Sequence, residues 1–285
     1  SAGALTTVTD AMEINQGGVL LMPLLNSVAG NILIQTAGVT ITSVDFSGLT
    51  EGAARTADNE LALPEATSVK ISGVLPTTVN CPKATEFVSG STTAQTATTI
   101  TVDGSTSFSL GAASFSGQVT ITAKGAVTLA GVTSAKQLSI TSDASVDLGG
   151  LTALASSTVI SATTVNLSSV AAISAVANIT ASSVDIASLK TTSAGATVTL
   201  VGPTSVSAPA LETAGGGIVA ASATSFAAIQ LATSTGTIDV ANDATIEVGN
   251  LAAINDLVDF AGVKVLKLHA QEASLNYSTA VSITS

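Results

Sequence analysis

Residues Gln137–Ser156 read QLSITSDASVDLGGLTALAS. The stretch holds two short runs in which apolar and polar residues alternate, Leu138-x-Ile140 and Val146-x-Leu148, followed by Leu151. The twenty residues before it, GQVTITAKGAVTLAGVTSAK, carry the same pattern with a spacing of 19. Alternation with a period of two is the signature of a strand with one buried face. The stretch therefore predicts two strands per repeat and no helix.

The second half of this stretch defines a repeat, apolar-x-apolar-x-x-apolar, that recurs along most of the chain. Its first position lies at Phe108, Val127, Val146, Val165, Val184, Val206, Phe226 and Ile246, with steps of 19 and then of 22, 20 and 20 residues. Looser copies start at Leu20, Val44, Leu61 and Val79. Proline follows the second apolar position in four copies: Pro23, Pro64, Pro82 and Pro209. Proline at a fixed slot is typical of a strand end or a corner, where no donor is needed.

A unit of this size cannot bury its own apolar face, so successive copies must stack and pair edge to edge. The sequence therefore predicts an all-β fold, a parallel β-solenoid of about 12 coils of roughly 20 residues with two short strands per coil. We expect one domain over residues 1–285. Residues 1–17 form an N-terminal arm or cap, residues 18–262 the coils, and residues 263–285 a terminal coil and strand-like tail.

The order LSITSDASVDLGGLTALAS resembles the leucine-rich-repeat-like solenoids of receptor-L-domain type in microbial surface proteins. The resemblance covers about residues 18 to 278. It implies a role as an adhesin, a surface-layer component or an appendage subunit. The Asn ladder usual in leucine-rich repeats is absent, so a straighter two-sheet β-helix is the alternative architecture.

Composition excludes several classes of function. Charged residues make up 9% of the chain and the net charge is −11, which argues against binding nucleic acid or anionic membranes. The apolar run from Gly17 to Ile34 is interrupted by Pro23 and by asparagines, which favours a buried first coil over a membrane span. Arg55 is the one arginine, and His269 and Cys81 are the one histidine and the one cysteine. We therefore expect no enzyme, no zinc site and no disulfide, with Cys81 as a small buried side chain.

The polar position between the first two apolar positions predicts an outward column of side chains. In it, Asp147, Asn166 and Asp185 form a weak candidate site for Ca²⁺ or a sugar, although such a column is also typical of a solvated strand face. Calcium is the one cofactor that the sequence leaves open. Thr101, Thr120 and Ser139 begin a hydroxyl ladder that then breaks, which leaves ice binding as a minor alternative.

A solenoid has two ends with unpaired strand edges. The first coil is the most apolar segment, and the last residues are strand-like and uncharged after Glu272. We therefore expect an extracellular structural subunit that polymerises with itself through end-to-end or terminal-strand contacts. Its alternative is an adhesin or a module that binds surface glycans. The residues expected to carry assembly are Leu20, Leu21, Met22, Leu24, Leu25, Leu275, Tyr277, Val281 and Ile283.

Overall fold

The computed structural model describes residues 5–15, 17–34, 40–49, 51–55, 60–71, 75–89, 98–102, 107–110, 114–241, 244–248, 253–254 and 265–268. They form an all-β parallel β-solenoid of about ten turns. These residues contain no helix of the length and apolarity that crossing a membrane requires. The backbone divides into two units, residues 1–150 and 151–285.

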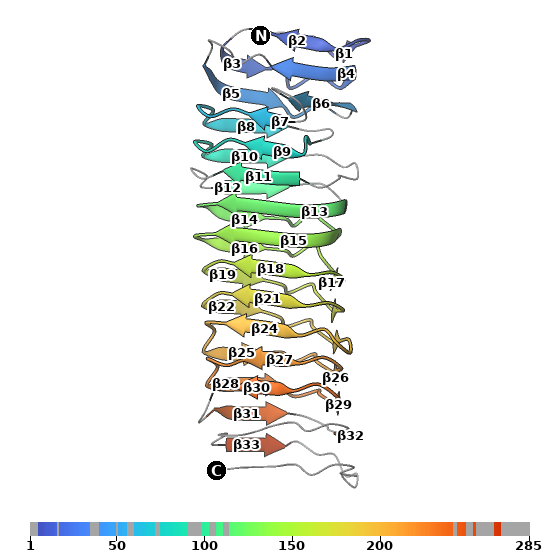
Figure 1. The fold of residues 1–285 in the computed structure, drawn as a ribbon, viewed down its shortest axis with the longest axis vertical. Helices are drawn as coiled ribbons and strands as arrows, with labels where there is room; N and C mark the ends of the chain where they lie inside the picture. The colour runs from blue at the N-terminus through green and yellow to red at the C-terminus, as the bar shows by residue number, and fades with distance from the viewer. Residues whose placement is uncertain are drawn as a thin grey trace. The chain divides into compact units, whose positions relative to one another are not determined.

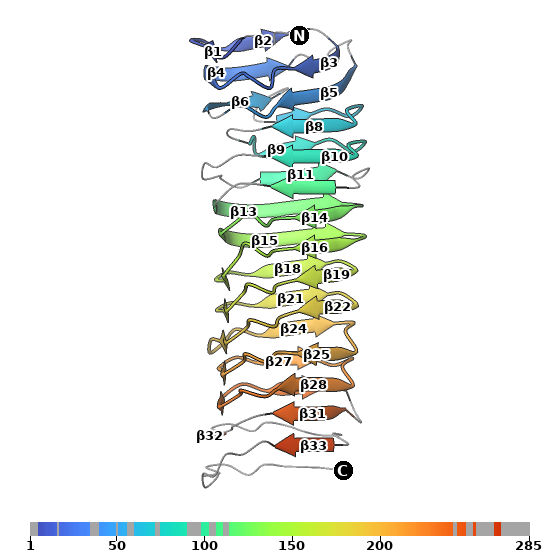
Figure 2. The ribbon, with the colours of Figure 1, turned by 180° about the vertical axis from the view of Figure 1, so that it is seen from behind.

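In the first unit, the chain alternates between two parallel sheets, which we call sheet I and sheet II (Figures 1 and 2). Sheet I has the order β3 (Gly18–Leu21), β5 (Ile41–Phe46), β8 (Ser68–Ile71), β10 (Glu86–Ser89), β12 (Ser107–Leu110), β14 (Ala126–Thr128) and β16 (Ser145–Asp147). Sheet II has the order β7 (Glu60–Ala62), β9 (Thr78–Asn80), β11 (Thr98–Val102), β13 (Ser114–Ala123) and β15 (Ser134–Ser142). At the N-terminal end, β4 (Ser27–Ile34) pairs with β1 (Thr7–Val8), β2 (Met12–Ile14) and β6 (Glu51–Arg55).

The core of the first unit is built from columns of aliphatic side chains, because in-register parallel strands place equivalent residues above one another. Val44 and Phe87 flank Val69 in sheet I, and all three are fully buried. In sheet II, Ile100 lies between Val79 and Ile121 and is likewise buried. Small and β-branched residues fill this space, which explains why the chain needs so few aromatic residues.

The second unit has three strands per coil where the sequence predicts two. One row is β18 (Thr158–Ser161), β21 (Ala177–Thr180), β24 (Val198–Val201), β27 (Ile218–Ala220) and β30 (Ile238–Val240). A second row is β19 (Thr164–Asn166) with β22 (Ser183–Asp185), then β25 (Ser205–Ser207), β28 (Ser225–Ala228), β31 (Thr245–Val248) and β33 (Val265–Leu268). The third row, of two-residue strands, is β17 (Ala153–Leu154), β20 (Ala172–Ile173), β23 (Thr191–Thr192), β26 (Thr213–Ala214), β29 (Thr233–Ser234) and β32 (Ala253–Ile254). A strand of two residues carries no visible alternation, so the sequence pattern misses it.

The repeat ends in a β-turn that joins its second and third apolar positions. The N–H of Val132 donates to the carbonyl of Leu129 at 2.9 Å, and the same bond closes the turns at Leu189 and Leu231. Proline in the fixed slot occupies the second residue of this turn, where its φ is already suitable and its missing N–H has no role. The predicted corner at the proline slot is confirmed.

Two early copies of the repeat were assigned to the wrong sheet. Leu61 and Val79 were aligned with Val44, but they lie in sheet II, and Val69 and Phe87 continue the column of Val44. The misassignment arises because the same proline turn also closes strands of sheet II, at Leu63–Ala66 and Cys81–Ala84. The solenoid has about ten turns instead of about twelve. Its first coils are longer than the repeat, with steps of 24 and 25 residues between the equivalent residues Leu20, Val44 and Val69.

Candidate functional site

The predicted column of Asp147, Asn166 and Asp185 stabilises the turns at the corners of the coils. The Oδ1 of Asp147 accepts the N–H of Gly149 at 2.9 Å, and Asp185 and Asn166 hold Ala187 and Ser168 in the same way. These are Asx turns, in which a short polar side chain fixes the backbone two residues on.

Asn166 and Asp185 are neighbours in register on β19 and β22, as the sequence predicts, and Asp147 ends β16 of the first unit. Within the described residues, no group of three or more His, Cys, Asp or Glu side chains has the arrangement that holds a metal ion. Because one oxygen of each side chain already caps a turn, the column has a structural explanation without a ligand. The calcium and sugar hypotheses stay predictions.

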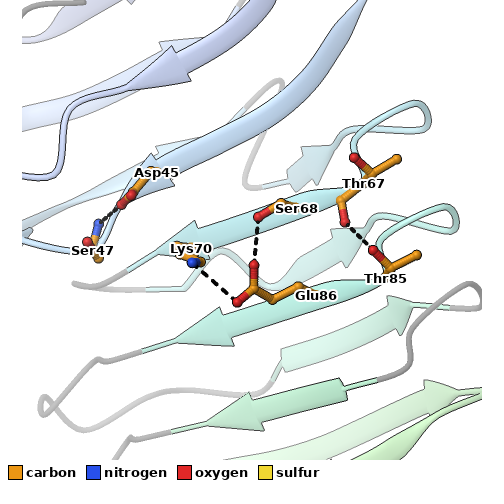
Figure 3. A network of polar contacts seen from close by, with 7 residues as sticks. All are labelled: Asp45, Ser47, Thr67, Ser68, Lys70, Thr85 and Glu86. Carbon is orange, nitrogen blue, oxygen red and sulfur yellow. Dashed lines mark hydrogen bonds and ion pairs between the residues drawn. The ribbon is translucent and has the colours of Figure 1, made fainter.

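Charged side chains gather on sheet I (Figure 3). Lys70 lies opposite Asp45 on the neighbouring strand, and its Nζ is 3.2 Å from Oε1 of Glu86. The second carboxylate oxygen of Glu86 accepts the hydroxyl of Ser68 at 2.9 Å. The Lys70–Glu86 pair is partly exposed, and exposed pairs contribute about 0–1 kcal/mol, so this network is a minor source of stability. It nevertheless gives the outer surface of sheet I a charged character.

A ladder of corner hydroxyls runs beside sheet I. The Thr85 hydroxyl donates to the carbonyl of Thr67 (Figure 3). The Thr67 hydroxyl donates in turn to the carbonyl of Thr42. In the second unit, Ser182 and Thr224 bond to the preceding coil in the same way. The apolar repeat alone does not predict this ladder. Its signal is a Ser or Thr two residues before the first apolar position, at Thr42, Thr67, Thr85, Thr163, Ser182, Thr204 and Thr224.

The residues predicted for assembly divide into core and surface. Leu20 and Leu25 are buried in the first coil, so they stabilise it from inside. Leu21 is 41% exposed and Leu24 is 57% exposed, Met22 is half-buried, and the neighbouring Val19 is 58% exposed. The other four, Leu275, Tyr277, Val281 and Ile283, lie outside the described residues.

The strand that carries Val19 and Leu21 is the last strand of sheet I. Among the described strands, β3 pairs with β5 alone, so its other edge has no strand beside it. An edge strand presents a row of backbone donors and acceptors to which a further strand can add. The first coil thus combines an open edge with an exposed apolar surface. We call Val19, Leu21 and Leu24 the first-coil patch.

Cys81 is the one cysteine of the chain, and His269 is the one histidine. Cys81 is buried, as predicted, and desolvation raises the pKa of its thiol to about 12, although a backbone hydrogen bond with Leu63 offsets part of the shift. Such a thiol is neutral at physiological pH and is a poor nucleophile. His269 lies outside the described residues.

No family model, no curated protein and no solved structure matches this chain.

Proposed function

We propose that the chain is a non-enzymatic, extracellular structural subunit that polymerises with itself at a cell surface. The observation that supports this most is the first-coil patch beside the edge of β3 with which no described strand pairs. A solenoid strand of a second copy is the partner that fits. The other strands of sheet I pair in parallel and stack their buried side chains on those of the next strand, and the edge of β3 can accept a strand in the same way. We also propose that the chain is related to the leucine-rich-repeat-like or receptor-L-domain-like solenoids of microbial surface proteins.

The proposed contact is heterologous. At the other end of the chain, β33 pairs with β31 alone among the described strands, so it also has an edge to offer. A β33 edge of one copy placed against the β3 edge of the next continues the parallel register. Such a contact does not close on itself, and it therefore produces an open polymer. Only 9% of the residues are charged, so few charges must be desolvated where two copies meet.

The first test replaces the exposed leucines of the first-coil patch. In Leu21→Lys and Leu24→Lys, each copy carries a new charge at the proposed contact while the buried Leu20 and Leu25 remain. We expect the wild-type chain to sediment as species that grow with concentration, and both variants to sediment as monomers. Ile229→Lys is the matched control, because Ile229 is 49% exposed, between Leu21 and Leu24, but lies on another coil. Monomers of the wild-type chain at every concentration, or equal loss in the control, would overturn the proposal.

A further inference from the structure

The outer surface of sheet II carries two parallel columns of uncharged polar side chains. One column is Thr78, Thr99, Thr120 and Ser139, and the other is Asn80, Thr101, Thr122 and Thr141. Both columns keep their register over four strands, because the one register shift, between Phe115 and Gln118, precedes them in β13. The predicted ladder groups Thr101 with Thr120 and Ser139, whereas Thr101 pairs with Thr122, and Thr120 pairs with Thr99. Thr101 therefore belongs to the second column, and each column is continuous over these four strands. We call the eight residues, seven of which carry a hydroxyl, the hydroxyl array.

The hydroxyl array faces solvent. Its members alternate with the buried Val79, Ile100, Ile121 and Ile140, and each is exposed or half-buried. In the described part of the chain, one side-chain hydrogen bond to the array is recorded, from Nε2 of Gln118 to Oγ1 of Thr120 at 3.3 Å. The corner threonines, by contrast, donate their hydroxyls to neighbouring coils. The hydroxyls of the array are thus accessible to water or to a ligand.

The array has two regular spacings. Neighbouring strands lie about 4.8 Å apart, and alternate residues of a parallel strand lie about 6.6 Å apart. Water oxygens on a prism face of hexagonal ice also form a rectangular lattice. Its shorter repeat is close to the strand spacing, and its longer repeat exceeds the spacing of alternate residues. Threonine is stiff at χ1, so the hydroxyls and methyl groups are held in place before binding and little entropy is lost on contact.

We propose that the hydroxyl array binds the surface of ice. Ice is neutral and offers hydrogen-bond donors and acceptors at fixed spacing, which suits hydroxyls that have methyl groups between them. The eight residues of the array carry no charge, which disfavours a mineral or a charged polymer. Glu60 lies beside Thr78 at one end of the array, and sheet I carries the Lys70–Glu86 pair. It has no aromatic ring on which a sugar could stack. This function is separate from polymerisation, because it uses sheet II and not the first-coil patch.

The test measures partition of the fluorescently labelled wild-type chain into a slowly growing ice hemisphere, together with thermal hysteresis. We expect incorporation into ice and a measurable hysteresis gap. Thr122→Tyr places a bulky ring at the centre of the array, and we expect it to abolish both. Thr128→Tyr is the matched control, since Thr128 faces outward and is half-buried on sheet I of the same unit. It should retain both activities. Circular dichroism reports whether each variant is folded.

A second variant guards against misfolding as the cause of loss. Thr122→Val keeps the shape and the methyl group and removes one hydroxyl, so a partial loss of hysteresis with unchanged circular dichroism supports the proposal. Exclusion of the wild-type chain from ice would overturn it, as would an equal loss in Thr128→Tyr. Loss of self-association in Thr122→Tyr, with no ice activity in the wild-type chain, would identify the array as an interface between copies instead.

Discussion

The hydroxyl of Thr85 lies 3.0 Å from the backbone carbonyl of Thr67, and that carbonyl also accepts the N–H of Thr85 at 2.9 Å. The N–H of Glu86 also donates to this carbonyl, at 3.3 Å, so its two lone pairs are shared among three donors. The Ser and Thr content of the chain therefore has a structural role at the corners in addition to any role at the surface.

Removal of a corner hydroxyl should weaken the stack. We expect Thr85→Val to lower the free energy of unfolding by about 1 kcal/mol, the usual net contribution of one hydrogen bond. Chemical denaturation followed by circular dichroism measures it. Thr128→Val is the control, because no hydrogen bond of the Thr128 hydroxyl is recorded among the described residues, and its midpoint should not change. A wild-type midpoint for Thr85→Val would show that water replaces the hydroxyl at no cost.

Loss of a buried hydroxyl in the third row of strands should lower the free energy of unfolding more than loss of a corner hydroxyl. The Oγ1 of Thr192 is buried, accepts the N–H of Gly216 at 3.2 Å, and donates to the Gly216 carbonyl at 3.3 Å. We expect Thr192→Val to cost about 1–3 kcal/mol, because it leaves a buried donor unpaired. The neighbouring Thr191→Val should be close to neutral. Equal denaturation midpoints for the two variants would contradict this account.

The buried thiol of Cys81 predicts that the stability of the fold depends on pH. The pKa of Cys81 rises from 9.0 to about 12 on folding, so the folded state keeps its proton where the unfolded state loses it. The contribution of this thiol to stability is therefore complete below about pH 9 and is lost as the pH rises toward 12. Cys81→Ala should show a shallower loss of stability over this window than the wild-type chain. Identical slopes would contradict the assignment.

The same burial predicts that Cys81 does not react with thiol reagents at pH 8 until the protein unfolds. Labelling followed by mass spectrometry, in buffer and in denaturant, measures this. Rapid labelling of the folded chain would show that the coil opens locally around Cys81.

Variants of Asp147 distinguish a structural role in the Asx turn from a role as a calcium ligand. Asp147→Ala removes the bond to Gly149 and should cost about 1 kcal/mol, whereas Asp147→Asn keeps an acceptor oxygen and should be nearly neutral. Added Ca²⁺ should leave the melting temperature of the wild-type chain unchanged. A calcium-dependent rise that is lost in Asp147→Asn would instead establish the metal site.

The sequence predicts the fold class because period-two alternation and the 19-residue spacing have one common solution, stacked parallel strands. It also predicts the corner after the second apolar position, because proline at that position favours a turn. It does not predict the assignment of Leu61 and Val79, because both sheets use the same turn. It misses the two-residue strands, which are too short to alternate.

The surfaces were predicted less well for a physical reason. A column of outward residues depends on register, and an error in the alignment of one strand changes every neighbour in the column. Thr101 and Thr122 come together only when β11 and β13 are correctly paired. By contrast, alternation along β3 explains why Leu20 is buried and Leu21 is exposed, although both were predicted to carry assembly.

The proposal of self-assembly is tested most directly by negative-stain electron microscopy of the purified chain over a concentration series, with Leu24→Lys alongside. The account predicts ordered filaments or sheets that become more abundant with concentration and are absent from Leu24→Lys. Dispersed single particles at every concentration of the wild-type chain would contradict it.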